Sequence, residues 1–444
     1  MSFADGTRKR TLSNFLSLSV LQLGNYVLPM ITLPIISRII GPENYGAINY
    51  AFAFVGYFIM FINAGFDLYG TRLIVSYNGD QEKISQLFSK ITFAKTYSLL
   101  IATVAFSIAV VAIPQVREYW LVHVFTYLMC VGWVLNPSWF YNGMQDAKRY
   151  AMFSFVSKVL FSVAVVLMVR EKGDYLYHPL ITSVAHILVS YISFRWAIKK
   201  FNVRLVWVKF KDVIQTLKEN SNLSLTWWIT NQSSSSGIII AGFLISAAAL
   251  GNYSAALRMV MIVLSVVSMP LNTVLFPVIG KSFSSGKSEG LEQVNRIFPY
   301  LFILAGAMCL GTWLVAEPLM LLFFGDQFAD SIPLLKIMSL VLLFSTINGA
   351  FGQQVMLNLK KDKAYTRFIL GGFLLNIMLL VLLIPVYGAM GAAIAWPASE
   401  LVVFCCYLVY FRRQNLRVFQ YEYYRPNFIV SNAAKLLSIR KKAL

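Results

Sequence analysis

Residues 368–386 read FILGGFLLNIMLLVLLIPV, and this stretch contains no charged side chain. A helix needs about 20 mostly apolar residues to cross the hydrocarbon core of a bilayer, so the stretch predicts a membrane-spanning helix. Soluble domains carry charged residues at about 25% of their positions. Here the charged fraction is 13% and the hydrophobic fraction is 58%. The composition of the whole chain therefore excludes a soluble or disordered protein.

Eleven further apolar stretches are found outward from residues 368–386, and the connections between them are short. The twelve predicted spans are Asn14–Ile36, Gly46–Phe66, Ile91–Ile113, Tyr119–Leu135, Ala151–Val169, Pro179–Ile198, Leu223–Ile245, Leu257–Ile279, Phe298–Val315, Ile332–Leu357, Phe368–Val386 and Ala389–Phe411. We predict an all-α membrane protein of about twelve transmembrane helices. The basic segment 199–222 between the sixth and seventh spans is expected to be an amphipathic helix on the lipid surface.

The net charge of +19 follows the predicted topology. About thirty of the 38 Lys and Arg residues fall in the termini and alternate loops on one side, counting Arg195 with the loop that follows it. Only four lie in the loops on the other side. Lys and Arg concentrate in cytoplasmic loops of membrane proteins. Both termini are therefore predicted to be cytoplasmic, and the positive charge implies contact with membrane lipids but no nucleic-acid partner.

An internal repeat relates the two halves of the chain. Residues 16–19 (LSLS) reappear as 223–226 (LSLT), and 44–47 (NYGA) as 252–255 (NYSA). The pattern K-x-Y-x-x-F occurs at 148–153 and at 363–368. An even number of spans per repeat gives parallel copies around an axis normal to the membrane. We predict two pseudo-symmetric six-helix lobes, 1–218 and 219–444, around a central cavity, which is the architecture of an alternating-access transporter.

Two predicted spans carry polar faces. Gln22 and Asn25 are three residues apart on one face of the first span, and the repeat places Thr230 and Ser233 at the matching positions of the seventh. Polar side chains within a bilayer face either other helices or a water-filled cavity. We favour cavity lining, with interhelical packing as the alternative.

Apart from Arg195, which is counted with the loop after its span, five charged residues fall inside the predicted spans. Lys158 is the deepest cation, with Ser154 and Ser162 four residues to either side. Lys95, Arg258 and Lys336 lie nearer the ends of their spans, where snorkelling to the headgroups is an equal alternative. Together they predict a cationic cavity for a phosphate or pyrophosphate group. Glu400 is either the ion-pair partner of one of these cations or a site of proton or Na⁺ coupling.

Motifs for enzymatic chemistry are not apparent in the sequence. The three histidines lack metal-ligand spacing. Gly280-Lys281-Ser282 and Gly286-Lys287-Ser288 lack the leading glycine of a nucleotide-binding loop. We expect no cofactor, no metal and no ATP site, and transport that is passive or ion-coupled.

Three stretches resemble the polysaccharide-transport family, which includes the O-antigen flippases, within the multidrug/oligosaccharidyl-lipid/polysaccharide exporter superfamily. They are residues 26–46 (YVLPMITLPIISRIIGPENYG), 136–145 (NPSWFYNGMQ) and 387–395 (YGAMGAAIA). The resemblance implies a flippase, not an enzyme. It would move undecaprenyl-pyrophosphate-linked oligosaccharide to the periplasmic leaflet of the bacterial inner membrane. There the oligosaccharide would pass to a glycan polymerase, which works with a chain-length regulator.

Two alternatives remain at this stage. A cation-coupled multidrug exporter of the same superfamily would need an acidic cavity for cationic drugs, whereas the predicted cavity is basic. An integral-membrane glycan polymerase or ligase would need a large external loop with catalytic groups, whereas the predicted external loops hold about twenty residues at most.

Overall fold

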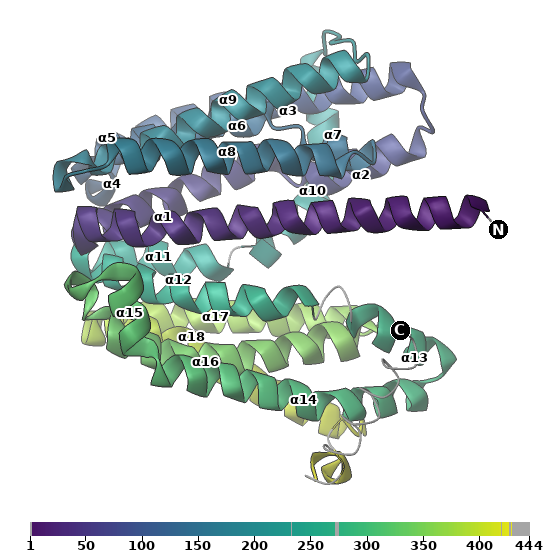
Figure 1. Cartoon of the computed structure of the whole chain (residues 1–444), viewed down its shortest axis with the longest axis vertical. Coiled ribbons are helices and arrows are strands. Elements are labelled where there is room, and N and C mark those ends of the chain that lie inside the picture. Colours follow the sequence, from purple (N-terminus) through teal and green to yellow (C-terminus); the bar gives the residue numbers. More distant parts are fainter. Residues whose placement is uncertain (1, 232, 271–274, 419, 426–427, 429–444) are drawn as a thin grey trace. The chain divides into compact units, whose positions relative to one another are not determined.

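The computed structural model describes the chain apart from residues 1, 232, 271–274, 419, 426–427 and 429–444. For residues 2–27, 29, 221–231, 233–235 and 267–270 it describes the backbone alone. The secondary structure of the described residues is helical (Figure 1). The chain divides into two compact units. Unit 1 comprises Met1–Gly251 and Leu322–Gln327, and unit 2 comprises Asn252–Leu321 and Phe328–Leu444.

Unit 1 is a bundle of helices of very different lengths. Its helices are α1 (Ser2–Asn63), α2 (Phe66–Ser76), α3 (Gln81–Ala112), α4 (Pro114–Glu118), α5 (Trp120–Tyr127), α6 (Met129–Leu135), α7 (Ser138–Gly143), α8 (Ala147–Met168), α9 (Tyr177–Lys200), α10 (Phe210–Asn231) and α11 (Ser233–Leu244), with a short 3₁₀ helix, η1, at Lys172–Leu176. The fourth predicted span is thus broken into short segments.

Unit 2 repeats the pattern of long helices joined by short turns. After α12 (Ala247–Pro270), which begins at the end of unit 1, come α13 (Phe276–Ser285), α14 (Lys287–Leu314), α15 (Ala316–Phe324), η3 (Asp326–Phe328), α16 (Ser331–Gly349), α17 (Asp362–Tyr387), α18 (Ala389–Arg413) and η5 (Tyr421–Tyr424). Between α16 and α17 the chain forms a π-helix, η4 (Ala350–Leu357). The residues of α15 from Leu322 onward belong to unit 1.

Ten helical stretches among the described residues are long and apolar enough to cross a membrane. They coincide with predicted spans two to six and eight to twelve. The first and seventh predicted spans include the residues whose backbone alone is described, and this backbone is helical in α1, α10 and α11. The eighth span lies at Ala247–Val266, about ten residues before its predicted start. The all-α membrane fold is therefore confirmed, whereas the lobe boundary at 218/219 stays a prediction.

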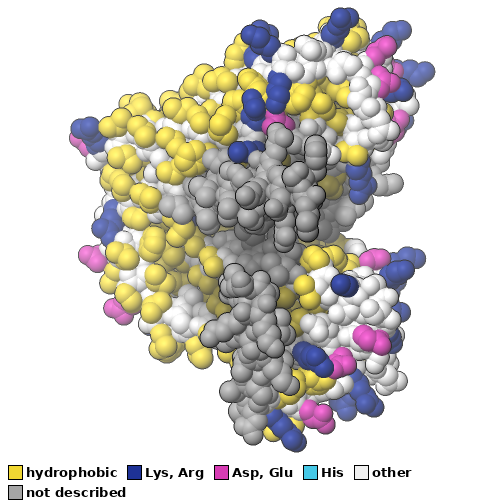
Figure 2. Space-filling view, turned by 45° about the vertical axis from the view of Figure 1, so that its right-hand side comes forward, with side chains coloured by type: hydrophobic (Ala, Val, Ile, Leu, Met, Phe, Trp, Pro, Cys, Tyr) yellow, Lys and Arg dark blue, Asp and Glu magenta, His cyan; other side chains and the backbone are white. Residues whose placement is uncertain are grey.

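Large apolar side chains cover the outer faces of several spans. On α3, Leu100, Val104, Ile108 and Val111 are each more than half exposed. Figure 2 shows apolar side chains over much of the visible surface, with many Lys and Arg side chains toward its right-hand side. Exposed apolar faces of this extent are stable in contact with lipid and would aggregate in water.

Each unit has its own aromatic core, and the repeat places equivalent residues against it. In unit 1, Tyr150 and Phe153 of α8 pack against a buried cluster that includes Tyr141. In unit 2, Tyr365 and Phe368 of α17 pack against a buried cluster that includes Tyr407. These two pairs occupy matching positions of the K-x-Y-x-x-F pattern. The repeat in the sequence therefore corresponds to similar packing at the start of two helices.

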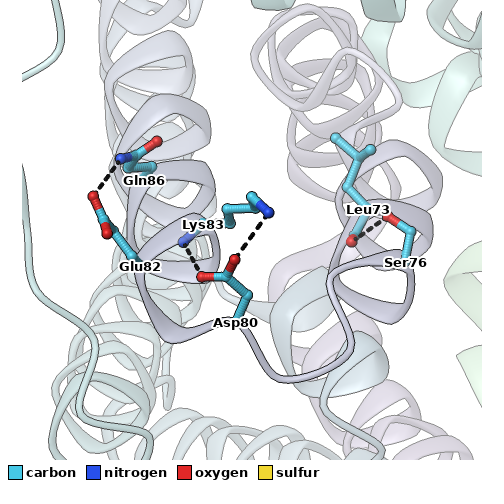
Figure 3. A network of polar contacts seen from close by, with 6 residues as sticks. All are labelled: Leu73, Ser76, Asp80, Glu82, Lys83 and Gln86. Carbon is cyan, nitrogen blue, oxygen red and sulfur yellow. Dashed lines mark hydrogen bonds and ion pairs between the residues drawn. The ribbon is translucent and has the colours of Figure 1, made fainter.

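A polar turn joins α2 to α3, and the Asp80 side chain caps α3 by accepting a hydrogen bond from the backbone N–H of Lys83 at 3.2 Å (Figure 3). The Lys83 ammonium lies 2.9 Å from the same carboxylate. Hydrogen bonds from the Lys83 side chain, and then from its backbone, hold the pKa of the Asp80 carboxyl below its usual range. The cap therefore stabilises α3 at neutral pH, and this contribution is lost as the pH falls through that lowered pKa.

The linker after α9 differs from the expectation of one amphipathic helix. Residues 203–209 have no helical structure, and α10 begins only at Phe210. The backbone N–H groups of Arg204 and Val206 donate to the hydroxyls of Ser85 and Ser89 on α3, at 3.1 and 2.9 Å. The two serines satisfy two backbone N–H groups of the linker that a helix would otherwise have to satisfy. Sequence periodicity did not reveal this.

The end of α15 packs on the first turn between spans within unit 1. The Arg38 guanidinium donates to the carbonyl of Leu322 at 2.6 Å, and the Ser37 hydroxyl donates to the carbonyl of Phe323 at 3.2 Å. The rings of Tyr45 and Phe324 meet edge to face at 5.8 Å. A segment far along the sequence thereby completes unit 1.

Glycine is required where α1 bends and where α1 meets α12. Gly41 has φ +75°, a conformation that residues with a side chain rarely adopt. A Cβ at Gly46 would overlap the carbonyl oxygen of Ala247, and one at Gly251 would overlap that of Pro42. The two backbones therefore touch directly at this point.

We expect Gly46→Ala to destabilise the protein by about 1–3 kcal/mol, because the added methyl group overpacks a contact between two backbones. Gly56→Ala is the matched control, since a Cβ at Gly56 would have no atom within 4 Å. The measurement is thermal unfolding of the purified protein in detergent. Equal melting temperatures for both variants would contradict the packing described here.

Candidate functional site

A cavity of about 240 Å³ lies inside unit 1 between α6, α8 and α9. Twelve residues line it: Met129, Trp133, Asn136, Tyr150, Phe153, Ser154, Ser157, Lys158, His186, Val189, Ser190 and Ser193. Aromatic rings come from all three helices, serine hydroxyls come from α8 and α9, and the lining includes neither Asp nor Glu. The cavity therefore combines a cation with neutral hydrogen-bonding groups.

Lys158 enters this cavity from the side of α8 that faces away from its exposed apolar side chains. Met152, Val156, Leu160 and Val163 are between 42% and 54% exposed and follow one another at helical spacing. Lys158 is two residues from both Val156 and Leu160, which places it about 200° around the helix from each. The Lys158 side chain is exposed and lines the cavity. It is thus well placed to meet a ligand from inside the protein.

Two residues of the lining carry a ring nitrogen that has no hydrogen-bond partner among the described residues. The Nε1 atom of Trp133 and the Nε2 atom of His186 are both buried and unpaired. The two rings lie 5.2 Å apart. Lys158 is close enough to act on His186 electrostatically. Other buried polar side-chain atoms among the described residues, such as the Tyr50 hydroxyl and the Nε2 atom of His123, also have no hydrogen-bond partner, so this feature is not particular to the cavity.

Lys95 stands behind the wall of the cavity. Its side chain is 1% exposed, and its Nζ atom lies 3.4 Å from the carbonyl oxygen of Trp133 and 3.5 Å from that of Asn136. These carbonyls belong to the end of α6, where a cation is favourable to the helix dipole. Asp67 acts on the Lys95 ammonium electrostatically. The alternative that Lys95 snorkels to the headgroups is therefore wrong. Its ammonium instead binds the carbonyl groups at the end of α6, within the broken fourth span.

The other predicted cations are not part of this cavity. Arg258 on α12 is exposed. Lys336 on α16 is half-buried, with its ammonium 5.7 Å from the ring centre of Trp313. Both residues belong to unit 2. Their predicted contact with substrate stays a prediction.

The predicted polar faces of the first and seventh spans cannot be compared with the structure. Gln22, Asn25, Thr230 and Ser233 have side chains outside the described residues. Their backbones belong to α1, α10 and α11. Cavity lining by these residues stays a prediction.

Glu400 lies within α18 and is held by neutral partners. The amide Nδ2 of Asn348 donates to its carboxylate at 2.7 Å, and the indole N–H of Trp396 donates at 3.3 Å. No ion pair to Glu400 occurs among the residues that the structure describes. The described residues therefore give no support to an ion pair between Glu400 and one of the predicted cations. The role of Glu400 in proton or Na⁺ coupling stays a prediction.

Trp133 and His186 were not among the residues predicted from the sequence. The spacing of the three histidines argues against metal ligation and indicates no other role for His186. Both residues have apolar neighbours along the sequence, and their approach depends on the packing of α6 against α9. A Cβ at Gly132 would overlap the His186 ring, so this glycine lets the two helices come close. Sequence spacing alone carries no sign of that contact.

The fold defines a class of multi-pass membrane protein shared with solved flippase and exporter structures. The structure of the lipid II flippase MurJ, in an inward closed conformation, matches with a TM-score of 0.73 and 13% identity over 96% of this chain and 93% of that chain. An inward-facing multidrug resistance MATE family transporter matches with a TM-score of 0.69 and 15% identity, over 90% and 98% of the two chains. At these identities the likeness concerns the fold alone.

The sequence comparisons add the family. Residues 11–283 match the family described as polysaccharide biosynthesis protein, and the chain belongs to this family. A putative O-antigen transporter of Escherichia coli K12 is 24% identical over 91% of this chain and 97% of its own length. The succinoglycan biosynthesis transport protein of Rhizobium meliloti is 26% identical over 74% of this chain and 66% of its own length. The resemblance seen in the sequence motifs is confirmed.

We expect Lys95→Met to destabilise the protein by about 1–3 kcal/mol, because the substitution leaves the end of α6 and Asp67 without their buried cation. Lys199→Met makes the same chemical change at an exposed position and should leave stability unchanged. Thermal unfolding of both variants in detergent tests this. A Lys95→Met protein as stable as the parent would contradict the structural role described here for Lys95.

Proposed function

We propose that this protein is a flippase that moves undecaprenyl-pyrophosphate-linked oligosaccharide repeat units, of the O-antigen or capsule type, across the bacterial inner membrane by alternating access. The observation that carries the proposal is the cavity of unit 1, which holds the Lys158 cation and no lining carboxylate. A cationic site within the bilayer suits a pyrophosphate group. The relatives named as O-antigen and succinoglycan transporters support the same substrate class.

Two kinds of group in the proposed site suit two different parts of the substrate, the pyrophosphate and the sugars. Lys158 would meet the pyrophosphate, while the serine hydroxyls and aromatic rings beside it suit sugar hydroxyls and sugar faces. A multidrug exporter for cationic drugs would want acidic groups in the same place, and none lines this cavity. A polymerase or ligase, as an enzyme, has less support because the relatives are named as transporters.

We further propose Glu400 as the candidate for proton or Na⁺ coupling, since neutral groups hold its carboxylate. No cofactor or ATP site forms part of the proposal. The product would pass on the periplasmic side to a glycan polymerase and its chain-length regulator.

The decisive experiment is complementation of a flippase-null strain that carries the matching glycan gene cluster. The parent protein should restore surface glycan. Lys158→Ala should reduce export about tenfold or more, because a charge-assisted hydrogen bond contributes about 1.5–3 kcal/mol. Lys158→Arg keeps the cation and should retain more activity. Lys199→Ala is the control for loss of one positive charge.

Two results would contradict the proposal in different ways. If the parent protein leaves surface glycan absent, the flippase assignment fails. If Lys158→Ala restores glycan fully, the assignment stands and Lys158 is removed from the site. Immunoblots of membrane fractions would establish that each variant is present at parental levels.

The proposed orientation places both termini and the end of the fourth span in the cytoplasm, as the distribution of Lys and Arg indicates. A reporter enzyme that works only in the cytoplasm should be active when it is fused after Asn142 or at the C-terminus. A reporter that works only in the periplasm should be inactive at both positions. A fusion in the loop before α5, at Glu118, should report the periplasm. A periplasmic signal after Asn142 would overturn this topology.

A further inference from the structure

The chain ends two of its helices in the same way, one in each unit. Residues 199–204 (KKFNVR), across the end of α9, match residues 412–417 (RRQNLR), across the end of α18. The asparagines of the two matches, Asn202 and Asn415, have φ of +49° and +50°. The residue after each asparagine donates its backbone N–H to the carbonyl five residues earlier, at 3.0 and 2.9 Å. A left-handed residue with such a bond ends a helix and turns the chain aside.

In unit 1 the chain after this turn is held against α3. We call residues 202–211 the first strap. Its Val203 and Val208 side chains are buried, and the backbone between them donates to the two serine hydroxyls of α3. The Trp207 ring is 79% exposed and meets the ring of Phe93 on α3 at 5.3 Å. The first strap is therefore fixed by its backbone and its valines, with the indole on the outside.

In unit 2 the chain after the matching turn is held against α14. We call residues 415–425, without residue 419, the second strap. The side-chain amide of Asn295 on α14 donates to the carbonyl of Arg417 at 2.6 Å. The Tyr424 ring meets the ring of Phe302 on α14 at 6.0 Å. The two straps thus share a turn, a polar contact to the backbone and an aromatic contact to a long helix.

Each aromatic contact lies just before the part of the long helix that exposes apolar side chains. On α3 the large exposed apolar side chains begin at Leu100, which is about 10 Å along the helix from Phe93. On α14 they begin at Ile303, directly after Phe302. Trp and Tyr are enriched where a membrane protein passes through the headgroup region. The two aromatic contacts therefore lie where the headgroups of a surrounding bilayer would be.

The outer sides of the straps combine apolar and basic side chains. The first strap exposes Leu205, Val206, Trp207, Phe210, Arg204, Lys209 and Lys211. In the second strap Arg417 is exposed, Tyr421 is 78% exposed, and the Arg425 guanidinium lies 5.7 Å from the Tyr421 ring centre. Among the described residues, no ion pair engages any of these cations. Apolar side chains beside cations suit the interface of an anionic bilayer.

We propose that the two straps are binding surfaces for anionic phospholipids of the cytoplasmic leaflet, one in each unit. Arg204 and Arg417 bind headgroup phosphates, because a guanidinium can donate two parallel hydrogen bonds to one phosphate. Trp207 and Tyr421 lie between the headgroups and the start of the lipid chains. The cytoplasmic side follows from the proposed orientation, while the identity of the transported substrate does not enter.

The test measures how strongly brominated lipids quench the fluorescence of Trp207. The full-length protein is placed in vesicles of phosphatidylglycerol and phosphatidylcholine in equal amounts, with bromine on one lipid at a time. The difference in emission between the parent and Trp207→Phe isolates this indole from the other tryptophans. Brominated phosphatidylglycerol should quench it about fivefold more strongly than brominated phosphatidylcholine, the effect of one basic side chain at an anionic surface.

The double variant Arg204→Gln with Lys209→Gln should lower this preference below twofold, measured against the same double variant with Trp207→Phe. Lys281→Gln with Lys287→Gln is the matched control. It removes the same charge at exposed positions outside the straps and should keep the preference.

A second reporter examines unit 2 independently. Tyr421→Trp places an indole at an exposed position of the second strap, and its added emission should show the same preference for brominated phosphatidylglycerol. Arg417→Gln with Arg425→Gln should abolish that preference. The parent and Tyr421→Trp also decide the matter if a double variant yields too little folded protein.

Three outcomes overturn the proposal. Equal quenching by the two brominated lipids in the parent would show that the first strap does not select anionic lipid. An unchanged preference in Arg204→Gln with Lys209→Gln would show that these cations do not provide it. Quenching of Trp207 by aqueous iodide, but by neither lipid, would place the strap in water, where a protein partner could cover it.

Discussion

Polar groups within the spanning helices must find partners inside the protein, because the hydrocarbon core of the bilayer offers none. The broken fourth span depends on this constraint. Its helix α6 ends at Leu135, and the Lys95 ammonium donates to the carbonyls of Trp133 and Asn136 at this end. Nearby, the Tyr141 hydroxyl donates to the carbonyl of Ser193, and the Ser183 hydroxyl to that of Phe125. Other buried polar atoms among the described residues have no such partner, among them the Nε2 atoms of His123 and His186.

The same constraint separates two kinds of intramembrane cation. Lys95 is surrounded by its own chain and is needed to finish a helix, whereas Lys158 is exposed along a cavity wall. Depth in the sequence ranked them the other way, with Lys158 deepest and Lys95 nearer the end of its span. Their difference comes from neighbours: α6 ends beside Lys95, while α8 carries Lys158 on the face away from the apolar side chains that α8 exposes.

Most of the fold was predictable from the sequence, because a spanning helix is specified locally by length and composition. The spans of α3, α8, α14, α17 and α18 follow directly from their apolar runs. The start of α12 was misplaced by about ten residues, since the segment 247–256 is small and polar in places and its helix is set by the close backbone contact at Gly251. The extended linker and the Trp133–His186 pair were beyond reach for a similar reason: each depends on which helix lies alongside.

The assignment of Leu322–Gln327 to unit 1 has a consequence for synthesis. Residues 1–251 leave the ribosome without the segment that accepts hydrogen bonds from Arg38 and Ser37. At roughly 5–20 residues per second, the chain up to Gln327 follows about 4–15 s later. During that interval Arg38 and Ser37 lack the carbonyl groups of Leu322 and Phe323, to which they donate in the folded protein. The first unit to emerge is thus completed only when a large part of the second has been made.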